Sequence, residues 1–163
     1  MVKGYGDTVN IKAACQAELV VLVVEDHLMF SKDVKHALPE HKVVLARSVE
    51  EAKLRYDECL PNITFLDIDL PDGAGFEVLE YIRDKEPDAY VVMATGSKVE
   101  SDVLVSQKKG ARGYIIKPFT KSKIEQHLRQ FQEYREKQIK SLLAETTAHR
   151  SKELALMPHM QIT

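Results

Sequence analysis

Short apolar runs alternate with longer amphipathic segments along this chain. The first run, Leu19–Val24, is continuously apolar and mostly β-branched, which is typical of a parallel strand covered on both faces. Comparable runs predict four more strands, at residues 42–46, 62–68, 90–95 and 113–118.

The amphipathic segments between these runs predict helices, and their ends carry stop signals. Pro39, Pro61 and Pro87 follow three of the segments, Gly110 closes a fourth, and Ser48 is a candidate N-cap. The predicted helices cover residues 29–38, 48–59, 75–86 and about 100–109, with a long final helix that begins near Thr120.

Five strands that alternate with five helices predict an α/β fold of βαβ crossovers, with a parallel sheet covered by helices on both faces. Sites in such sheets form beyond the carboxyl ends of the strands, where the strand order reverses. Each candidate polar residue stands at the end of a predicted strand: Glu25, Asp26, Asp67, Thr95 and Lys117.

Three carboxylates that converge at one edge repel one another unless they hold protons or a cation. Magnesium suits such a group, because it takes one or two carboxylates and leaves a position for a phosphate oxygen. A lysine can neutralise phosphoryl charge and a threonine hydroxyl can bind a phosphoryl oxygen, so the set favours phosphoryl transfer. Gly73, Gly75 and Gly96 leave backbone room beside it.

Composition narrows the function classes. The 163 residues fit one domain of ordinary size, with 44% hydrophobic and 29% charged residues and a formal net charge of -2. This balance argues against a nucleic-acid partner. Cys15 and Cys59 have no metal or disulfide spacing. The sequence shows no signal peptide or membrane span, which predicts a cytoplasmic protein without a membrane partner.

Four motifs resemble the receiver domain of bacterial response regulators, the two-component signalling family that includes the chemotaxis regulator. They are VVEDH, FLDIDLPDGAG, MATGS and GYIIKPF, in family order and each at a strand end. The resemblance runs from about Leu19 to Phe131. It implies a flavodoxin-like, doubly wound (βα)5 fold with strand order 2-1-3-4-5, extended here by a C-terminal helix.

The resemblance implies a role for each site residue. Asp67 would be the phosphoacceptor, which makes the chain a phosphoprotein carrying an aspartyl phosphate. Magnesium would be held by Asp26 and Asp67, by Glu25 through water, and by the backbone carbonyl of Asp69. Lys117 would pair with Asp67 and then with the phosphoryl group.

The resemblance also implies the switch. Thr95 would bind a phosphoryl oxygen, Tyr114 would be the rotameric aromatic switch, and Pro118 would position the preceding lysine through a cis peptide. Asp69 and Ser97, each two residues beyond a site residue, are expected to tune the lifetime of the phosphorylated state. His27 is left without a role.

The expected partners are a sensor histidine kinase or histidine phosphotransfer protein as phosphoryl donor, and a downstream protein target in a phosphorelay. The target would contact the fourth helix, fifth strand and fifth helix, where Val103, Lys108 and Lys121 lie. No enzyme activity is expected beyond self-phosphorylation from a donor and autodephosphorylation.

The expected domain organisation is an N-terminal extension at 1–18, a receiver domain at 19–133 and a helical extension at 134–163. The extension carries Ile139, Leu142 and Leu143. It is either a solvated charged helix or a pairing helix, so a homodimer could form through this helix or through the output face.

Two rival functions remain. Asp67-Ile68-Asp69 resembles the DxD nucleophile motif of haloacid-dehalogenase-like phosphatases, although that family places its nucleophile strand first and its acidic pair last, opposite to the order here. The other rival, a receiver-shaped scaffold that is never phosphorylated, is disfavoured by the complete set of site residues.

Overall fold

The computed structural model describes residues 17–96 and 100–157. The chain divides into two compact units, and residues 18–131 form the one that contains the sheet. Its five parallel strands are arranged β2-β1-β3-β6-β7. Counted within this sheet, the order is 2-1-3-4-5, which confirms the predicted fold. The strands are β1 (Val20–Val24), β2 (Lys42–Ala46), β3 (Ile63–Asp67), β6 (Tyr90–Thr95) and β7 (Gly113–Ile116).

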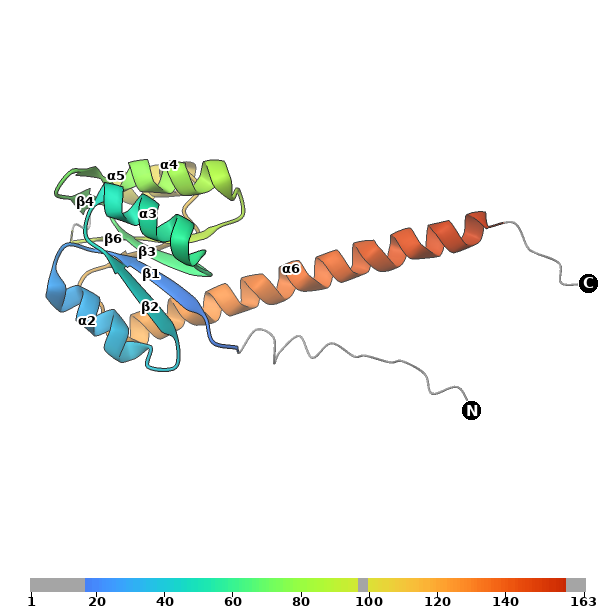
Figure 1. Cartoon of the computed structure of the whole chain (residues 1–163), viewed down its shortest axis with the longest axis horizontal. Helices are drawn as coiled ribbons and strands as arrows, with labels where there is room; N and C mark the ends of the chain where they lie inside the picture. The colour runs from blue at the N-terminus through green and yellow to red at the C-terminus, as the bar shows by residue number, and fades with distance from the viewer. Residues whose placement is uncertain (1–16, 97–99, 158–163) are drawn as a thin grey trace, which may run out of the picture. The chain divides into compact units, whose positions relative to one another are not determined.

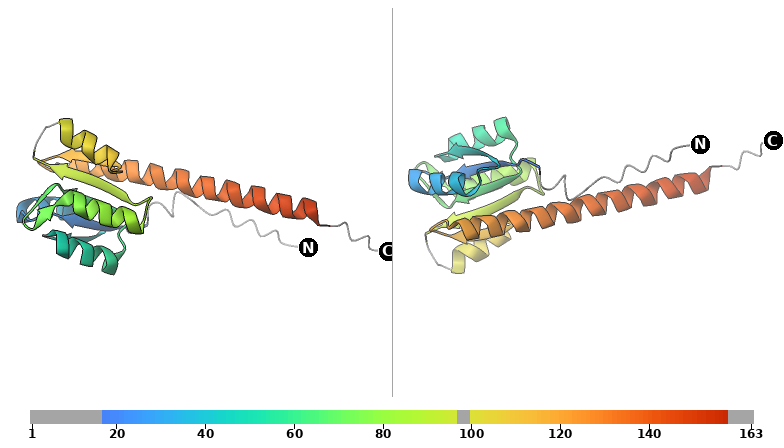
Figure 2. Two further views of the ribbon diagram at one scale, coloured as in Figure 1. Left: turned by 90° about the horizontal axis from the view of Figure 1, so that it is seen from above. Right: turned by 90° about the horizontal axis from the view of Figure 1, so that it is seen from below.

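Helices cover both faces of the sheet (Figures 1 and 2). On one face lie α3 (Val49–Cys59), α4 (Gly75–Lys85) and α5 (Glu100–Lys108). On the other lie α2 (Leu28–Ala37) and the first turns of α6 (Lys121–Leu156). Ile124, Leu128 and Phe131 of α6 are buried, as their spacing of four and three residues predicts.

Local signals explain several helix ends. The Ser48 hydroxyl accepts a hydrogen bond from the Glu51 N–H (3.1 Å), as expected for an N-cap. Gly110 has φ +91°, a conformation that favours glycine. The Asp72 carboxylate accepts hydrogen bonds from the Val49 and Glu50 N–H groups (2.7 and 3.2 Å), so α3 has a second cap contributed by a distant loop.

The segment after β3, for which no strand is predicted, contains a small antiparallel hairpin. Its strands are β4 (Asp69–Leu70) and β5 (Gly73–Ala74). The Gly75 N–H donates to the Ile68 carbonyl (2.7 Å), which holds the start of α4 against the end of β3. The hairpin therefore ties the loop beyond Asp67 to the body of the domain.

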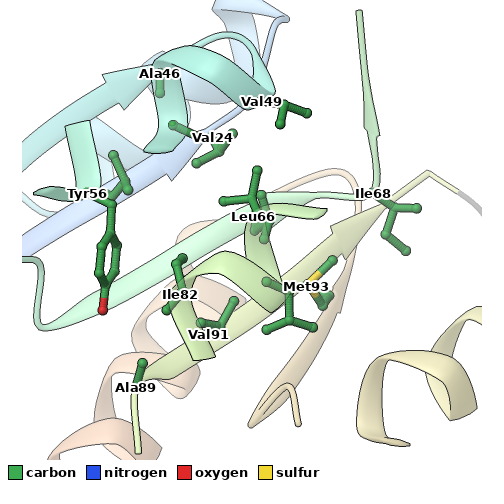
Figure 3. Close-up of a cluster of buried hydrophobic side chains, with 14 residues drawn as sticks. Val24, Ala46, Val49, Tyr56, Leu66, Ile68, Ile82, Ala89, Val91 and Met93 are labelled. Atoms are coloured by element: carbon green, nitrogen blue, oxygen red, sulfur yellow. The ribbon is translucent and has the colours of Figure 1, made fainter. Parts of the chain in front are cut away.

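A hydrophobic core cluster lies between the sheet and helices α3 and α4 (Figure 3). Leu22 and Leu66 from central strands are fully buried there, with Ile82 from α4. The Tyr56 hydroxyl, at the edge of the cluster, donates to Glu86 (2.6 Å). Because β1 and β3 are buried along almost their whole length, residues at their carboxyl ends are held on a rigid frame.

Among the described residues, no helix is long and apolar enough to cross a membrane. Cys59 is a free thiol, and Cys15 lies outside the described residues.

His127 of α6 should make stability depend on pH. Its ring stands edge-on to Phe65 (6.5 Å between centroids), and its buried Nδ1 has no hydrogen-bond partner among the described residues. Burial lowers the His127 pKa, and a contact with the Tyr114 backbone only partly opposes this. The unfolded chain therefore binds a proton more readily than the folded one, and stability falls as pH drops below about 6.5.

We expect urea unfolding between pH 7.5 and 5 to show a smaller loss of stability for His127→Leu than for the wild-type chain. His36→Leu, which removes an exposed histidine, is the matched control. Equal pH dependence in wild type and His127→Leu would contradict the prediction.

Candidate functional site

The sheet topology brings the predicted strand-end residues to one edge. Val24 at the end of β1 pairs with Leu66 on β3, Asp67 pairs with Ala94 on β6, and Thr95 pairs with Ile116 on β7. Because these strands are parallel, the residues at or just after their carboxyl ends lie side by side.

Lys117, directly after β7, joins two of the carboxylates. Its Nζ lies 2.8 Å from Asp67 Oδ2 and also forms an ion pair with Glu25 Oε2. The three side chains are 10%, 6% and 1% exposed, so the interaction is largely shielded from water. The other Asp67 oxygen, Oδ1, accepts a hydrogen bond from the Asp69 N–H (3.2 Å).

Burial and charge set the protonation of this group. Burial raises the Glu25 pKa, the Asp67 charge adds to this effect, and the hydrogen bond from Lys117 opposes it. For Lys117, burial works to lower the pKa, but the hydrogen bonds to Asp67 and Glu25 outweigh it and the pKa is raised. One lysine cation is thus shared by two carboxyl groups.

Asp26 and His27 continue the site toward solvent. The His27 ring Nδ1 lies 2.9 Å from Asp26 Oδ1 and 3.1 Å from Glu25 Oε1. The backbone N–H of His27 donates a hydrogen bond to the same Glu25 oxygen (3.0 Å). The hydrogen bond to Glu25 and the Asp26 charge raise the His27 pKa. Although desolvation works to raise the Asp26 pKa, interactions with Glu25 and His27 lower it overall.

A cleft of about 450 Å³ opens over these residues. Asp26, Asp67 and Lys117 line it together, so the acids of the first and third strands and the lysine after the last strand face one space. The complete lining is Asp26, His27, Phe30, Asp67, Asp69, Leu70, Pro71, Gly96 and Lys117.

The carboxylates at this cleft, rather than the His27 nitrogen, fit a hard divalent cation. Glu25, Asp26 and His27 can each offer one ligand atom, and these atoms lie within 4.8 Å of one another. The Asp67 carboxylate lines the same cleft. Carboxylate oxygens are the protein ligands that magnesium prefers, and an open cleft leaves room for the waters it retains.

The other predicted residues lie near this centre or outside the described part. Thr95 is buried at the end of β6, and its carbonyl accepts a hydrogen bond from the Lys117 N–H (2.8 Å). Tyr114 is half-buried on β7 against the core cluster. The Lys117–Pro118 peptide is cis, as predicted. Ser97 lies outside the described residues, and the roles of all these residues remain predictions.

Phe30 is a site residue that sequence reasoning missed. The sequence places it only within the predicted helix at 29–38, but its ring lines the cleft and the ring centroid lies 4.8 Å from Lys117 Nζ. Its position in the first turn of the helix after the acidic pair is a signal that could have identified it, because side chains there lie close to the preceding strand end.

The pattern described as the response regulator receiver domain matches residues 21–129. This chain belongs to that family. The receiver domain is 32% identical over 109 residues to the chemotaxis protein CheY of Listeria monocytogenes, a match covering 65% of this chain and 92% of that protein. Receiver domains are signalling domains rather than enzymes, and the match gives no support to the dehalogenase-like alternative.

Solved structures agree with the family. A CheY-like receiver domain from Methanospirillum hungatei is similar with a TM-score of 0.70 and 25% identity, covering 75% of this chain and 99% of that one. A complex of CheX, CheY, BeF3 and magnesium from Borrelia burgdorferi is similar with a TM-score of 0.67 and 26% identity, covering 72% and 92%. The domain boundaries predicted from sequence remain predictions.

Proposed function

We propose that this receiver domain is a phosphorylation-activated switch that accepts a phosphoryl group on Asp67 from a phosphohistidine donor. The observation that carries the proposal is the bridge from Lys117 to Asp67 and Glu25 beneath an open cleft. Asp26, Asp67 and the backbone carbonyl of Asp69 would hold magnesium, with Glu25 acting through water. The bound ion would neutralise charge on the phosphoryl oxygens.

In the transfer, an Asp67 carboxylate oxygen attacks phosphorus as the bond from phosphorus to the histidine nitrogen breaks. The nitrogen keeps the bonding electron pair, and Asp67 becomes an acyl phosphate. Lys117 would then pass from the carboxylate to a phosphoryl oxygen, and Thr95, buried at the end of the adjacent strand β6, would donate its hydroxyl to another. Water then attacks phosphorus, the bond between phosphorus and the Asp67 oxygen breaks, and the products are inorganic phosphate and the free Asp67 carboxylate.

The output follows from a population shift. Phosphorylation replaces one carboxylate charge by about two negative charges and adds acceptor oxygens. Contacts from Thr95 and inward rotation of Tyr114 would favour a changed surface on α5, β7 and α6. That surface displays Leu104 (55% exposed) and Val105 (38% exposed), which offer apolar contacts to a downstream protein in the cytoplasm.

The test is to incubate the chain with magnesium and acetyl phosphate and follow its intact mass. We expect the chain to gain one phosphoryl group with magnesium and none when EDTA is added in place of magnesium. Failure to gain mass at any donor concentration would contradict the proposal. Continuous release of phosphate from unrelated phosphate esters would instead indicate a phosphatase.

Asp69 should tune the lifetime of the phosphorylated state. Its side chain lines the cleft while its N–H binds Asp67. A carboxylate there can repel or orient the attacking water, and a change of about 1 kcal/mol in that interaction alters the rate about fivefold. We expect Asp69→Asn to change the autodephosphorylation rate without a change in fold. A faster rate would show that the carboxylate repels the attacking water, and a slower rate would show that it orients the water. Equal decay rates would contradict the prediction.

The C-terminal part of α6 is proposed as a homodimer contact. Every residue from 140 to 157 is exposed, including Leu142 (63%) and Leu154 (62%). Most helical stability in proteins comes from packing of an apolar face, so this exposed stretch would be stabilised by pairing with a second copy. Sedimentation velocity should show a dimer whose fraction rises with protein concentration. The double variant Leu142→Lys/Leu154→Lys should be monomeric, whereas the control Lys152→Ala should still dimerise. A wild-type chain that is monomeric at all concentrations would contradict the proposal. A double variant that still dimerises would also contradict it and would indicate a dimer through the α5, β7 and α6 face.

A further inference from the structure

Phe30 brings an aromatic face to the lysine of the site. The residue lies in the first turn of α2, is half-buried and lines the cleft. Its ring centroid is 4.8 Å from Lys117 Nζ, well inside the distance at which an ammonium group interacts with an aromatic face. The lysine comes from the other end of the domain sequence, so this contact joins α2 to the segment after β7.

The ring is held in place by aromatic neighbours. Phe119, two residues after Lys117 and only 5% exposed, makes a T-shaped contact with Phe30 (5.7 Å, 85°). His27 makes a second edge contact (5.9 Å, 69°). Such contacts stabilise a defined ring orientation, so Phe30 is a fixed part of the cleft wall.

The surroundings of the ammonium group make this contact effective. Lys117 has three N–H donors, and carboxylates of Glu25 and Asp67 are its ion-pair partners. Its side chain is 10% exposed. The Phe30 ring occupies a side from which water would otherwise hydrate the ammonium, and a cation–π contact is strongest when the cation is desolvated.

We infer that Phe30 is a positioning residue for Lys117 during phosphoryl transfer; this rests on the proposed function of Asp67. When Asp67 becomes an acyl phosphate, Lys117 exchanges a carboxylate oxygen for a phosphoryl oxygen. The Phe30 ring does not take part in that exchange, so it holds the ammonium at the cleft through both states.

The test compares Phe30→Leu, Phe30→Tyr and the control Met29→Ala, which changes an exposed neighbour on the same helix (72% exposed). With acetyl phosphate and magnesium, Phe30→Leu should be labelled more slowly than wild type, because an ammonium without the ring must be ordered during the reaction. The energy of the lost cation–π contact sets the upper limit of this loss at about thirtyfold. Phe30→Tyr should keep most of the wild-type labelling rate, because tyrosine retains the aromatic ring. Met29→Ala should match wild type.

A second measurement does not depend on phosphorylation. In a double-mutant cycle on urea unfolding, Phe30→Leu should destabilise the wild-type chain more than the Lys117→Met chain, because the ring then has no cation to bind. Additive effects, or Phe30→Leu labelled at the wild-type rate, would overturn the inference while leaving phosphorylation of Asp67 intact. If the wild-type chain takes no label but the cycle shows coupling, the proposed function of Asp67 is wrong, while the energetic contact between Phe30 and Lys117 is supported.

Discussion

Replacement of Asp67 by Asn is expected to abolish labelling by acetyl phosphate. An amide oxygen is a far weaker nucleophile than a carboxylate, and the other carboxyl group that binds Lys117, Glu25, is 1% exposed. Intact mass after incubation with magnesium should therefore show one added phosphoryl group for wild type and none for Asp67→Asn.

The variant should remain folded, which makes a negative result meaningful. Lys117 keeps its ion pair with Glu25, and removal of the Asp67 charge relieves a like charge that raises the Glu25 pKa. Asp84→Asn, which removes an exposed carboxylate on α4, is the matched control and should label like wild type. Equal label on Asp67→Asn and wild type would show that the acceptor lies elsewhere.

The sequence predicted those features that depend on local pattern. Continuous apolar runs such as Leu19–Val24 identified the buried strands, and the residues after them marked the edge where Asp67 and Lys117 meet. The cis peptide before Pro118 followed from family resemblance. Strand burial can be predicted because it depends on the composition of a single segment. The meeting of the strand ends then follows from one rule, that parallel strands place their carboxyl ends at the same edge of the sheet.

The individual contacts between distant segments could not be predicted, although the position of Phe30 in the first turn of its helix could have marked it as a residue near the site. The cap that Asp72 gives to α3 spans 23 positions, and the contact between Phe30 and Lys117 spans most of the domain. Neither leaves a periodic pattern in the sequence. The hairpin of Asp69–Leu70 with Gly73–Ala74 was hidden for another reason, since two-residue strands are too short for any alternation to appear.

Gly75→Ala is expected to be strongly destabilising, because the end of the phosphoacceptor strand touches this glycine. An added Cβ would lie 1.9 Å from the Asp67 carbonyl oxygen and 3.1 Å from Ile68 Cα. Both are backbone atoms of a buried segment and cannot move aside without displacing Asp67. Overpacking of this kind costs about 3 kcal/mol, which exceeds the gain of about 1 kcal/mol that alanine normally brings to a helix.

The urea midpoint followed by circular dichroism measures this effect, and Gly96→Ala is the matched control at the same edge of the sheet. Among the described residues, no atom lies within 4 Å of a Cβ added at Gly96, so that variant should unfold like wild type. If Gly75→Ala is as stable as Gly96→Ala, α4 does not press on β3 as described. If it is destabilised but folded, its labelling should also slow, because the strain falls on the backbone that carries Asp67.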